Sequence, residues 1–283
     1  MMEDKAYAFW LAANKGEEKC CLATIIQLET EGKYEPLRLC MTESGKIETT
    51  IDQTDIIHAI RPILMEKMQA HLGQSEMQEV ILKSGDTLQV FVDIYIPKSK
   101  IIIFGAGHDA IPVAHFSQKL GFETTVVDAR ETFNSAENFP NCERIIAHPS
   151  SFTEKVPVSP FTYVIIMNHH IEKDRETLQF ALQSPSPYVG VLGPRSRREK
   201  MLTQLKEDDV IFSGEVLEKM YNPIGLDIGA ETPEEIAISI LSEIIAIQKG
   251  HQGGFLHDQH QIHRHTSKYE EVGKGISYVQ GTN

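Results

Sequence analysis

The chain has 283 residues, of which 41% are hydrophobic and 24% are charged, a composition typical of a globular protein with one large or two modest domains. Its net charge of −13 disfavours nucleic acids and anionic membrane surfaces as partners, although a helix N-terminus or a local arginine cluster can still bind an anion. The four cysteines form no CxxC pair and the N-terminus does not resemble a signal peptide, so we expect reduced thiols and a cytoplasmic location.

The first 97 residues are predicted to form a small α+β domain. A helix is expected over residues 3–14, and a second helix from Asp52 or Thr54 to about residue 72, where Gly73 fits its end. Apolar and β-branched runs predict two pairs of strands, at residues 20–28 and 34–41 and at residues 79–83 and 87–96. Polar turns at residues 30–33 and 84–86 would join the strands of each pair.

Residues 98–249 are predicted to form a Rossmann-like α/β domain, because strand and helix patterns alternate and the strands are apolar on both faces. Strands are expected at residues 101–104, 123–127, 144–146, 162–167 and 188–192. Helices are expected at residues 109–120, 173–183, 195–206 and 233–248. The most apolar of these helices is too short to cross a membrane and contains Glu243. Residues 250–283 are polar and His-rich, and we expect them to be disordered.

The first strand of this domain leads into a glycine-rich turn of the kind that binds dinucleotides. Gly105, Gly107 and Ala110 occupy the three small-residue positions of the motif, and His108 follows the second glycine. The order strand, glycine turn, helix, strand is the context that this motif requires. The N–H groups at the start of such a helix favour a phosphate, so we expect these four residues to contact a ligand.

An acidic residue closes the second strand about twenty residues later, where dinucleotide-binding proteins place the acceptor for a ribose hydroxyl. Asp128 holds that position and would favour NAD over NADP. Arg130 follows two residues later and would either neutralise a phosphate or pair with Asp128.

Two further segments place polar residues where predicted strands end. Asn168, His169 and His170 are predicted ligand contacts at the carboxyl edge of the sheet. The alternative for the histidines is hydrogen bonding within their loop. Basic and small residues open the helix that starts near residue 195 and predict an anion site there: Gly193, Arg195, Ser196 and Arg197. Pairing with nearby acids is the alternative for these arginines.

The apolar loop at residues 222–229 leads into the last helix, which begins with a capping threonine and a proline. Asp227 and Glu231 flank the end of this loop. Both are predicted either to face the site or to cap the helix.

Four of these segments together resemble the xanthine dehydrogenase accessory protein family (XdhC/CoxI). They read GAGH with VVDAR, MNHHIEKDRETL, YVGVLGPRSRREKML, and PIGLDIGAETPEEIAISILSEIIA. The resemblance covers roughly residues 100–249 and implies a small N-terminal domain joined to a Rossmann domain, in a homodimer. It also implies binding of molybdenum cofactor (molybdopterin), a cysteine desulfurase partner, and delivery to a xanthine dehydrogenase-type apo-molybdoenzyme.

The N-terminal half departs from that family, because it lacks a Gly-Ser-Ser-Pro-Arg-type loop and a Gly-Gly-Cys-type turn. The delivery of a cofactor by a protein without turnover of its own is therefore predicted from the C-terminal half. An NAD-dependent oxidoreductase that uses the glycine motif is the alternative, and a nucleotide or redox sensor is a third hypothesis. No catalytic or metal-ligating residue is predicted from the sequence.

Overall fold

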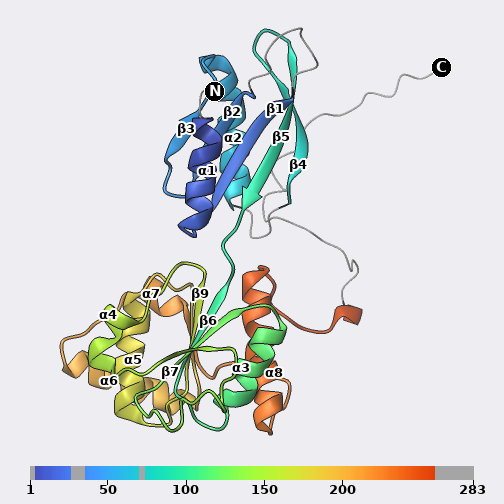
Figure 1. Cartoon of the computed structure of the whole chain (residues 1–283). Coiled ribbons are helices and arrows are strands. Elements are labelled where there is room, and N and C mark those ends of the chain that lie inside the picture. Colours follow the sequence, from blue (N-terminus) through green and yellow to red (C-terminus); the bar gives the residue numbers. More distant parts are fainter. Residues whose placement is uncertain (1–3, 27–35, 70–73, 259–283) are drawn as a thin grey trace.

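A computed structural model describes residues 4–26, 36–69 and 74–258 of the chain. It contains two sheets, one at each end of the molecule as drawn in Figure 1. Residues 96–99 connect them and belong to neither sheet. The first sheet is antiparallel and the second is parallel, so the fold class predicted from the sequence is confirmed.

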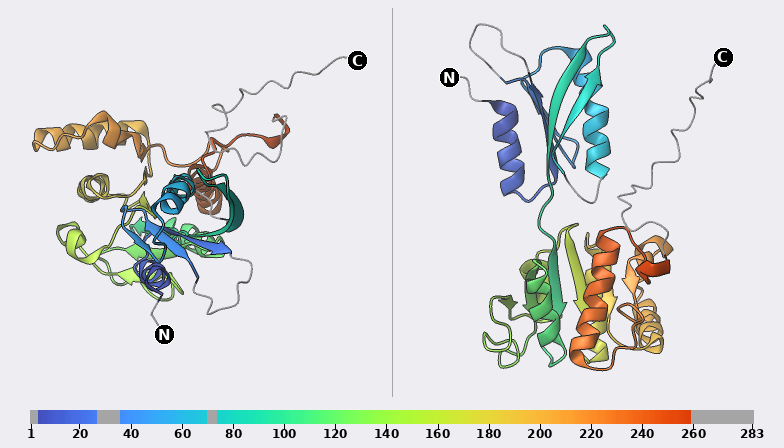
Figure 2. Two further views of the ribbon diagram at one scale, coloured as in Figure 1. Left: turned by 90° about the horizontal axis from the view of Figure 1, so that it is seen from above. Right: turned by 90° about the vertical axis from the view of Figure 1, so that its right-hand side faces the viewer.

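The first sheet has the strand order β3-β2-β1-β5-β4. Its strands are β1 (Cys20–Ile26), β2 (Arg38–Thr42), β3 (Ile47–Thr49), β4 (Glu76–Ile81) and β5 (Thr87–Tyr95). Helices α1 (Lys5–Lys15) and α2 (Thr54–Gln69) lie on opposite faces, as Figure 2 shows. Alternation along β1 explains this arrangement, since Cys20 packs on the α1 side and Cys21 on the α2 side.

Most elements of this half match the prediction to within a few residues, but β3 was not predicted. It has three residues, none of them buried, so it carries no apolar alternation that a sequence pattern could reveal. The predicted turn at residues 30–33 and the helix end at Gly73 lie outside the described residues.

The second sheet has the order β11-β10-β9-β6-β7-β8, and every pairing in it is parallel. Its strands are β6 (Lys100–Phe104), β7 (Glu123–Val127), β8 (Glu143–Ile145), β9 (Thr162–Ile166), β10 (Tyr188–Val191) and β11 (Met220–Tyr221). Counted along the chain this is the order 3-2-1-4-5-6 of dinucleotide-binding folds.

Helices cover both faces of the parallel sheet. Figure 1 shows α3 and α8 on one side and α4, α5 and α6 on the other. The bounds are α3 (Ala110–Lys119), α4 (Phe152–Lys155), α5 (Ile171–Gln183), α6 (Arg195–Glu207), α7 (Gly214–Glu218) and α8 (Pro233–Gln248), with short 3₁₀ turns η1 (Pro149–Ser151) and η2 (Leu256–Asp258). Ile103 packs on the α3–α8 side and Ile102 on the other, which explains why the strands are apolar on both faces.

The strands and helices predicted for this half are present, whereas η1, α4, α7 and β11 were not predicted. Each has five residues or fewer, too short to show a periodic pattern. The division into independently folding domains at residue 97 stays a prediction. Within the described ranges, no helix is both long and apolar enough to cross a membrane.

Candidate ligand-binding site

The strand order creates a switch point at β6, because the chain leaves β6 toward β7 on one side and later returns to β9 on the other. Open α/β sheets bind ligands in the crevice beyond the carboxyl ends of the two strands at such a point. The glycine-rich loop follows β6 and the Asn168–His170 segment follows β9. This edge faces away from the antiparallel sheet (Figure 1), because the connecting residues 96–99 enter β6 at its other end.

Gly105 makes the turn at the end of β6, and the protein's own backbone requires a glycine there. Its φ is +110°, and a Cβ at this position would lie 2.5 Å from the carbonyl oxygen of Met167. Its N–H donates to the carbonyl of Val127 (2.9 Å). The glycine therefore lets the loop cross closely between β7 and β9.

Gly107 differs, because neither its φ nor its neighbours require glycine. A Cβ there would meet only the His169 ring, at 3.5 Å, which is an ordinary contact. In the part of the chain that the structure describes, the N–H groups of Gly107, His108 and Asp109 have no protein acceptor. Three free N–H groups at the start of α3 can together bind an anion.

Asp128 closes the other side of the loop, and protein donors already occupy its carboxylate. Oδ2 accepts the N–H of Ala106 (2.8 Å) and Nη2 of Arg130 (2.7 Å), while Oδ1 accepts the N–H and Nε of Arg130 (2.9 and 3.1 Å). Burial acts to raise the pKa of Asp128, but the hydrogen bonds from Arg130 and Ala106 outweigh it and lower the pKa below its usual range. A carboxylate has about four lone-pair sites, so Asp128 offers no vacant acceptor to a ligand in this conformation.

The exposed group at this position is Arg130, whose side chain is 42% exposed while that of Asp128 is 4% exposed. Its guanidinium carbon lies 4.2 Å from the centroid of the Phe133 ring, and Phe133 is 47% exposed. The pairing with Asp128 and the stacking on Phe133 together fix the plane of the guanidinium.

His169 lies in the loop after β9, and its backbone is in the left-handed region, with φ at +59°. Its ring lies against Gly107, and its Nε2 is 3.5 Å from a carboxylate oxygen of Asp109. His170 instead pairs with Glu172 at 3.0 Å. Both rings are more than half exposed, so of the two adjacent histidines only His169 is placed against the glycine-rich loop.

A buried carboxylate that the sequence did not single out as a site residue organises the loops after β9 and β10. Asp174 is 1% exposed; its Oδ1 accepts the N–H and Nδ2 of Asn168 (3.1 and 3.0 Å), and its Oδ2 accepts Nε of Arg197 (3.0 Å). Arg197 is thus engaged in pairing with an acid, the alternative considered for it, rather than free for an anion. Gly193 permits this approach, since a Cβ there would lie 2.9 Å from Cδ of Arg197.

The start of α6 leaves Arg195 and Ser196 exposed. Pro194 occupies the cap position and no side chain caps the helix. The N–H of Arg197 donates to the carbonyl of Pro194 (2.9 Å), and among the described residues those of Arg195 and Ser196 have no protein acceptor. The prediction of an anion contact at these two residues stays a prediction.

Two residues that the sequence analysis did not single out as site residues hold the loop after β11 in place by hydrogen bonds. Asn222 donates through Nδ2 to the carbonyls of Val191 and Gly193 (3.0 and 2.9 Å). Glu243 of α8 accepts the hydroxyl of Tyr188 (2.6 Å) and the N–H of Gly225 (3.0 Å). Burial and the Glu243 carboxylate raise the pKa of Tyr188, so the phenol remains a donor.

Asp227 and Glu231 lie at the exposed tip of this loop and just before α8. The N–H of Glu231 donates to Oε2 of Glu235 (2.9 Å), and Thr232 with Glu235 forms a reciprocal cap. Thr232 and Glu235 therefore have the capping role that was considered for Glu231. Ligand contact by either acid stays a prediction.

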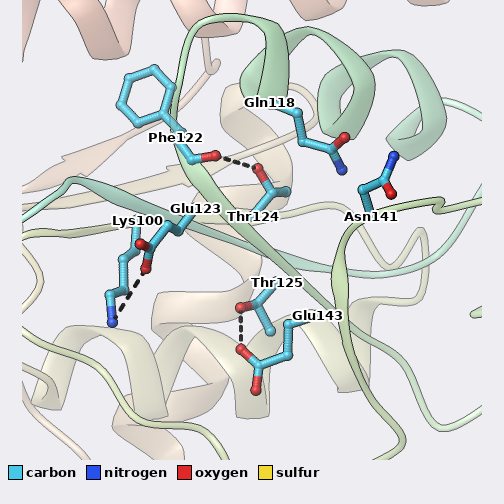
Figure 3. A pocket seen from close by; sticks show the side chains of 8 residues that line it. All are labelled: Lys100, Gln118, Phe122, Glu123, Thr124, Thr125, Asn141 and Glu143. Atoms are coloured by element: carbon cyan, nitrogen blue, oxygen red, sulfur yellow. Dashed lines mark hydrogen bonds and ion pairs between the residues drawn. The ribbon is translucent and has the colours of Figure 1, made fainter.

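A hollow of about 330 Å³ lies at the opposite end of the sheet. Figure 3 shows that its polar side chains interact with one another: Lys100 with Glu123 (3.6 Å) and Thr125 with Glu143 (2.9 Å). None of the residues predicted to bind a ligand lines it. The glycine-rich loop, with unpaired donors at a switch point, is therefore the stronger candidate.

Fold and site together define a Rossmann-type protein whose described residues leave unpaired N–H donors in the glycine-rich loop, at the carboxyl edge of the parallel sheet. The model of the XdhC Rossmann domain matches residues 101–244, and the chain belongs to this family.

Two curated proteins are similar to the chain. A protein of Bacillus subtilis (strain 168), named as a probable xanthine dehydrogenase subunit, is 29% identical over 236 residues, covering 79% of this chain and 67% of that protein. The uncharacterized protein YqeB of Escherichia coli (strain K12) is 28% identical over 262 residues, covering 88% of this chain but only 47% of that protein. The chain thus spans less than half the length of the second relative.

A solved structure titled as a xanthine dehydrogenase from Bacillus halodurans shares the fold. The match has a TM-score of 0.50 and 22% identity, and it covers 87% of this chain and 96% of that one. Identity at this level indicates a common fold and no more.

Proposed function

We propose that this protein is an accessory factor that binds molybdenum cofactor or a related pterin in the crevice after β6 and delivers it to a xanthine dehydrogenase-type molybdoenzyme. Membership of the XdhC family supports the link to xanthine dehydrogenase, as does the name of the Bacillus subtilis relative. The observation that carries the binding role is the row of free N–H groups at Gly107, His108 and Asp109.

The residues present fit the anionic part of such a ligand. Molybdopterin carries a phosphate, for which the free N–H groups at the start of α3 are suitable donors. Arg130, in the loop after β7, adds guanidinium N–H groups next to the glycine-rich loop, since Asp128 accepts from both Arg130 and the Ala106 N–H. When bound, the cofactor would supply the molybdenum and pterin chemistry of the client enzyme, and the role of this chain would be to hold the phosphate and release it.

The pterin ring needs hydrogen-bond partners at its edge, and only some predicted residues remain available. Asp128 has no vacant acceptor, and the amide nitrogen of Asn168 is used by Asp174. The side-chain oxygen of Asn168 and the carboxylate of Glu231 remain as proposed partners. A homodimer and an encounter with a cysteine desulfurase are parts of the same proposal.

The test is to purify the full chain from a molybdenum-competent host and to identify any released ligand by absorbance and mass. The loaded protein is then mixed with an apo-xanthine dehydrogenase, and recovery of activity is measured. We expect an oxidised pterin in the released fraction and activity that rises with the amount of chain added. Release of only a nicotinamide nucleotide, with no recovery of activity, would refute the proposal.

Variants at two glycines separate binding from folding. Gly107→Val places a branched side chain against the approach to the free N–H groups, and we expect little pterin to be retained. Gly214→Val is the matched control, because Gly214 opens α7 with nothing within 4 Å of a Cβ. Both proteins should give the same circular dichroism spectrum as the parent. Equal pterin content in the two variants would contradict a phosphate contact in this loop.

A further inference from the structure

The loop after β7 presents an exposed guanidinium where an NAD site presents a carboxylate. Proteins that bind NAD use the acid after the second strand to accept hydrogen bonds from the ribose diol, whereas an arginine near that place accommodates a 2′-phosphate. Here Asp128 is saturated by four protein donors. A diol would bind Asp128 only after displacing Arg130 or the Ala106 N–H.

Arg130 retains donors that the protein does not use. A guanidinium has five N–H groups, and the side-chain bonds to Asp128 engage Nε and one N–H of Nη2. Three N–H groups are left on a side chain that is 42% exposed. Because Asp128 and Phe133 already fix the guanidinium plane, little side-chain entropy remains to be lost when a ligand binds.

Resting on the binding role proposed above, we propose that Arg130 is the specificity-determining residue of this site. It selects a ligand with a phosphate monoester beside a planar ring and disfavours a ligand with a free ribose diol. Two sources share this chemistry, a nucleotide with a 2′-phosphate and a phosphorylated pterin. The sequence pattern alone, with Asp128 as acceptor, predicted the opposite preference.

The charges around Arg130 determine how strongly it prefers a phosphorylated ligand. Asp128 balances its formal charge, and the exposed carboxylate of the adjacent Glu131 opposes an incoming dianion. The free N–H groups at the start of α3 act in the favourable direction. We therefore expect a preference of about ten-fold, equivalent to about 1.4 kcal/mol, rather than the larger value of an isolated arginine.

The experiment is isothermal titration of the full chain with two matched pairs of probes. One pair is 2′,5′-ADP and 5′-AMP, and the other is a pterin with and without its phosphate monoester. We expect the phosphorylated member to bind about ten-fold more tightly in at least one pair, and the pair that shows the difference identifies the source. Equal affinities in both pairs, tighter binding of the unphosphorylated members, or no binding of any probe at millimolar concentration would overturn the proposal.

Variants test whether the Arg130 side chain causes the preference for a phosphorylated ligand. Arg130→Gln should reduce the preference to less than about two-fold while the affinity for 5′-AMP stays constant, and Arg130→Lys should restore part of it. Glu131→Gln is the matched neighbour and should keep or slightly raise the preference. A ten-fold preference that survives in Arg130→Gln would show that another group reads the phosphate.

The outcome is distinguishable from that of the cofactor-delivery test. If a pterin is released from the purified protein but the probe pairs bind equally, the proposed function stands and the role of Arg130 fails. If the phosphate preference is present but no pterin is released and no activity is recovered, the role of Arg130 stands and cofactor delivery fails.

Discussion

Replacement of Gly105 by alanine tests whether the glycine-rich loop is shaped by the protein or by its ligand. The new Cβ would lie 2.5 Å from the carbonyl oxygen of Met167 and 2.9 Å from Cα of Asn168, both backbone atoms that cannot move aside easily. Overpacking of this kind costs about 1–3 kcal/mol, and a non-glycine residue at a φ of +110° costs a further ~1–3 kcal/mol. We expect a loss of about 4 kcal/mol in the free energy of unfolding, the sum of the two central values.

Two other glycines provide matched controls for the two contributions. Gly121 follows α3 with a φ of +88° and nothing within 4 Å of a Cβ, so Gly121→Ala isolates the backbone cost of about 1–3 kcal/mol. Gly107 has neither a positive φ nor a close neighbour, so Gly107→Ala should change stability by less than about 1 kcal/mol, in either direction.

The assay is urea unfolding followed by far-ultraviolet circular dichroism. The single tryptophan, Trp10, lies in α1, and its fluorescence reports separately on the antiparallel half. In the unfolding transition that circular dichroism detects and Trp10 fluorescence does not, we expect the largest loss of stability for Gly105→Ala. The loss should be smaller for Gly121→Ala and smallest for Gly107→Ala. A loss at Gly105 no greater than at Gly121 would show that the close approach of Met167 is not as described.

Two further predictions concern the buried carboxylates. Arg197→Met removes a partner of Asp174, which is 1% exposed, and should lower the free energy of unfolding by about 3 kcal/mol. The control Arg195→Met should change it by less than about 0.5 kcal/mol. Equal urea midpoints for the two variants would contradict this prediction. The lowered pKa of Asp128 means that its contribution is fully present above its unfolded pKa of about 3.9 and is lost as pH falls through the lower folded value. The penalty of Asp128→Asn should therefore shrink between pH 7 and pH 3, and a penalty independent of pH would refute the assignment.

The sequence by itself determined the helices and strands that are long enough to show a regular spacing of apolar residues. The strands of the parallel sheet are apolar on both faces because helices cover both, and α8 has a threonine cap and a proline at its start. The glycine-rich loop was also readable, because the φ of Gly105 and the start of α3 leave a local signature. Short elements such as β3 and β11 left none.

What only the tertiary structure decided is which polar groups find each other. The sequence marked Asp128 as an acceptor for a ligand and did not mark Asp174, yet the carboxylate of each receives four hydrogen bonds from the protein itself. The pairing of Asp174 with Arg197 and of Asp128 with the Ala106 N–H joins residues more than twenty positions apart, which local patterns do not reveal. The sequence allowed the Arg130–Asp128 pair as one of two alternatives, and only the structure chose between them. The sequence thus located the carboxyl edge of the sheet, and the pairing across that edge left Arg130, rather than Asp128, to face a ligand.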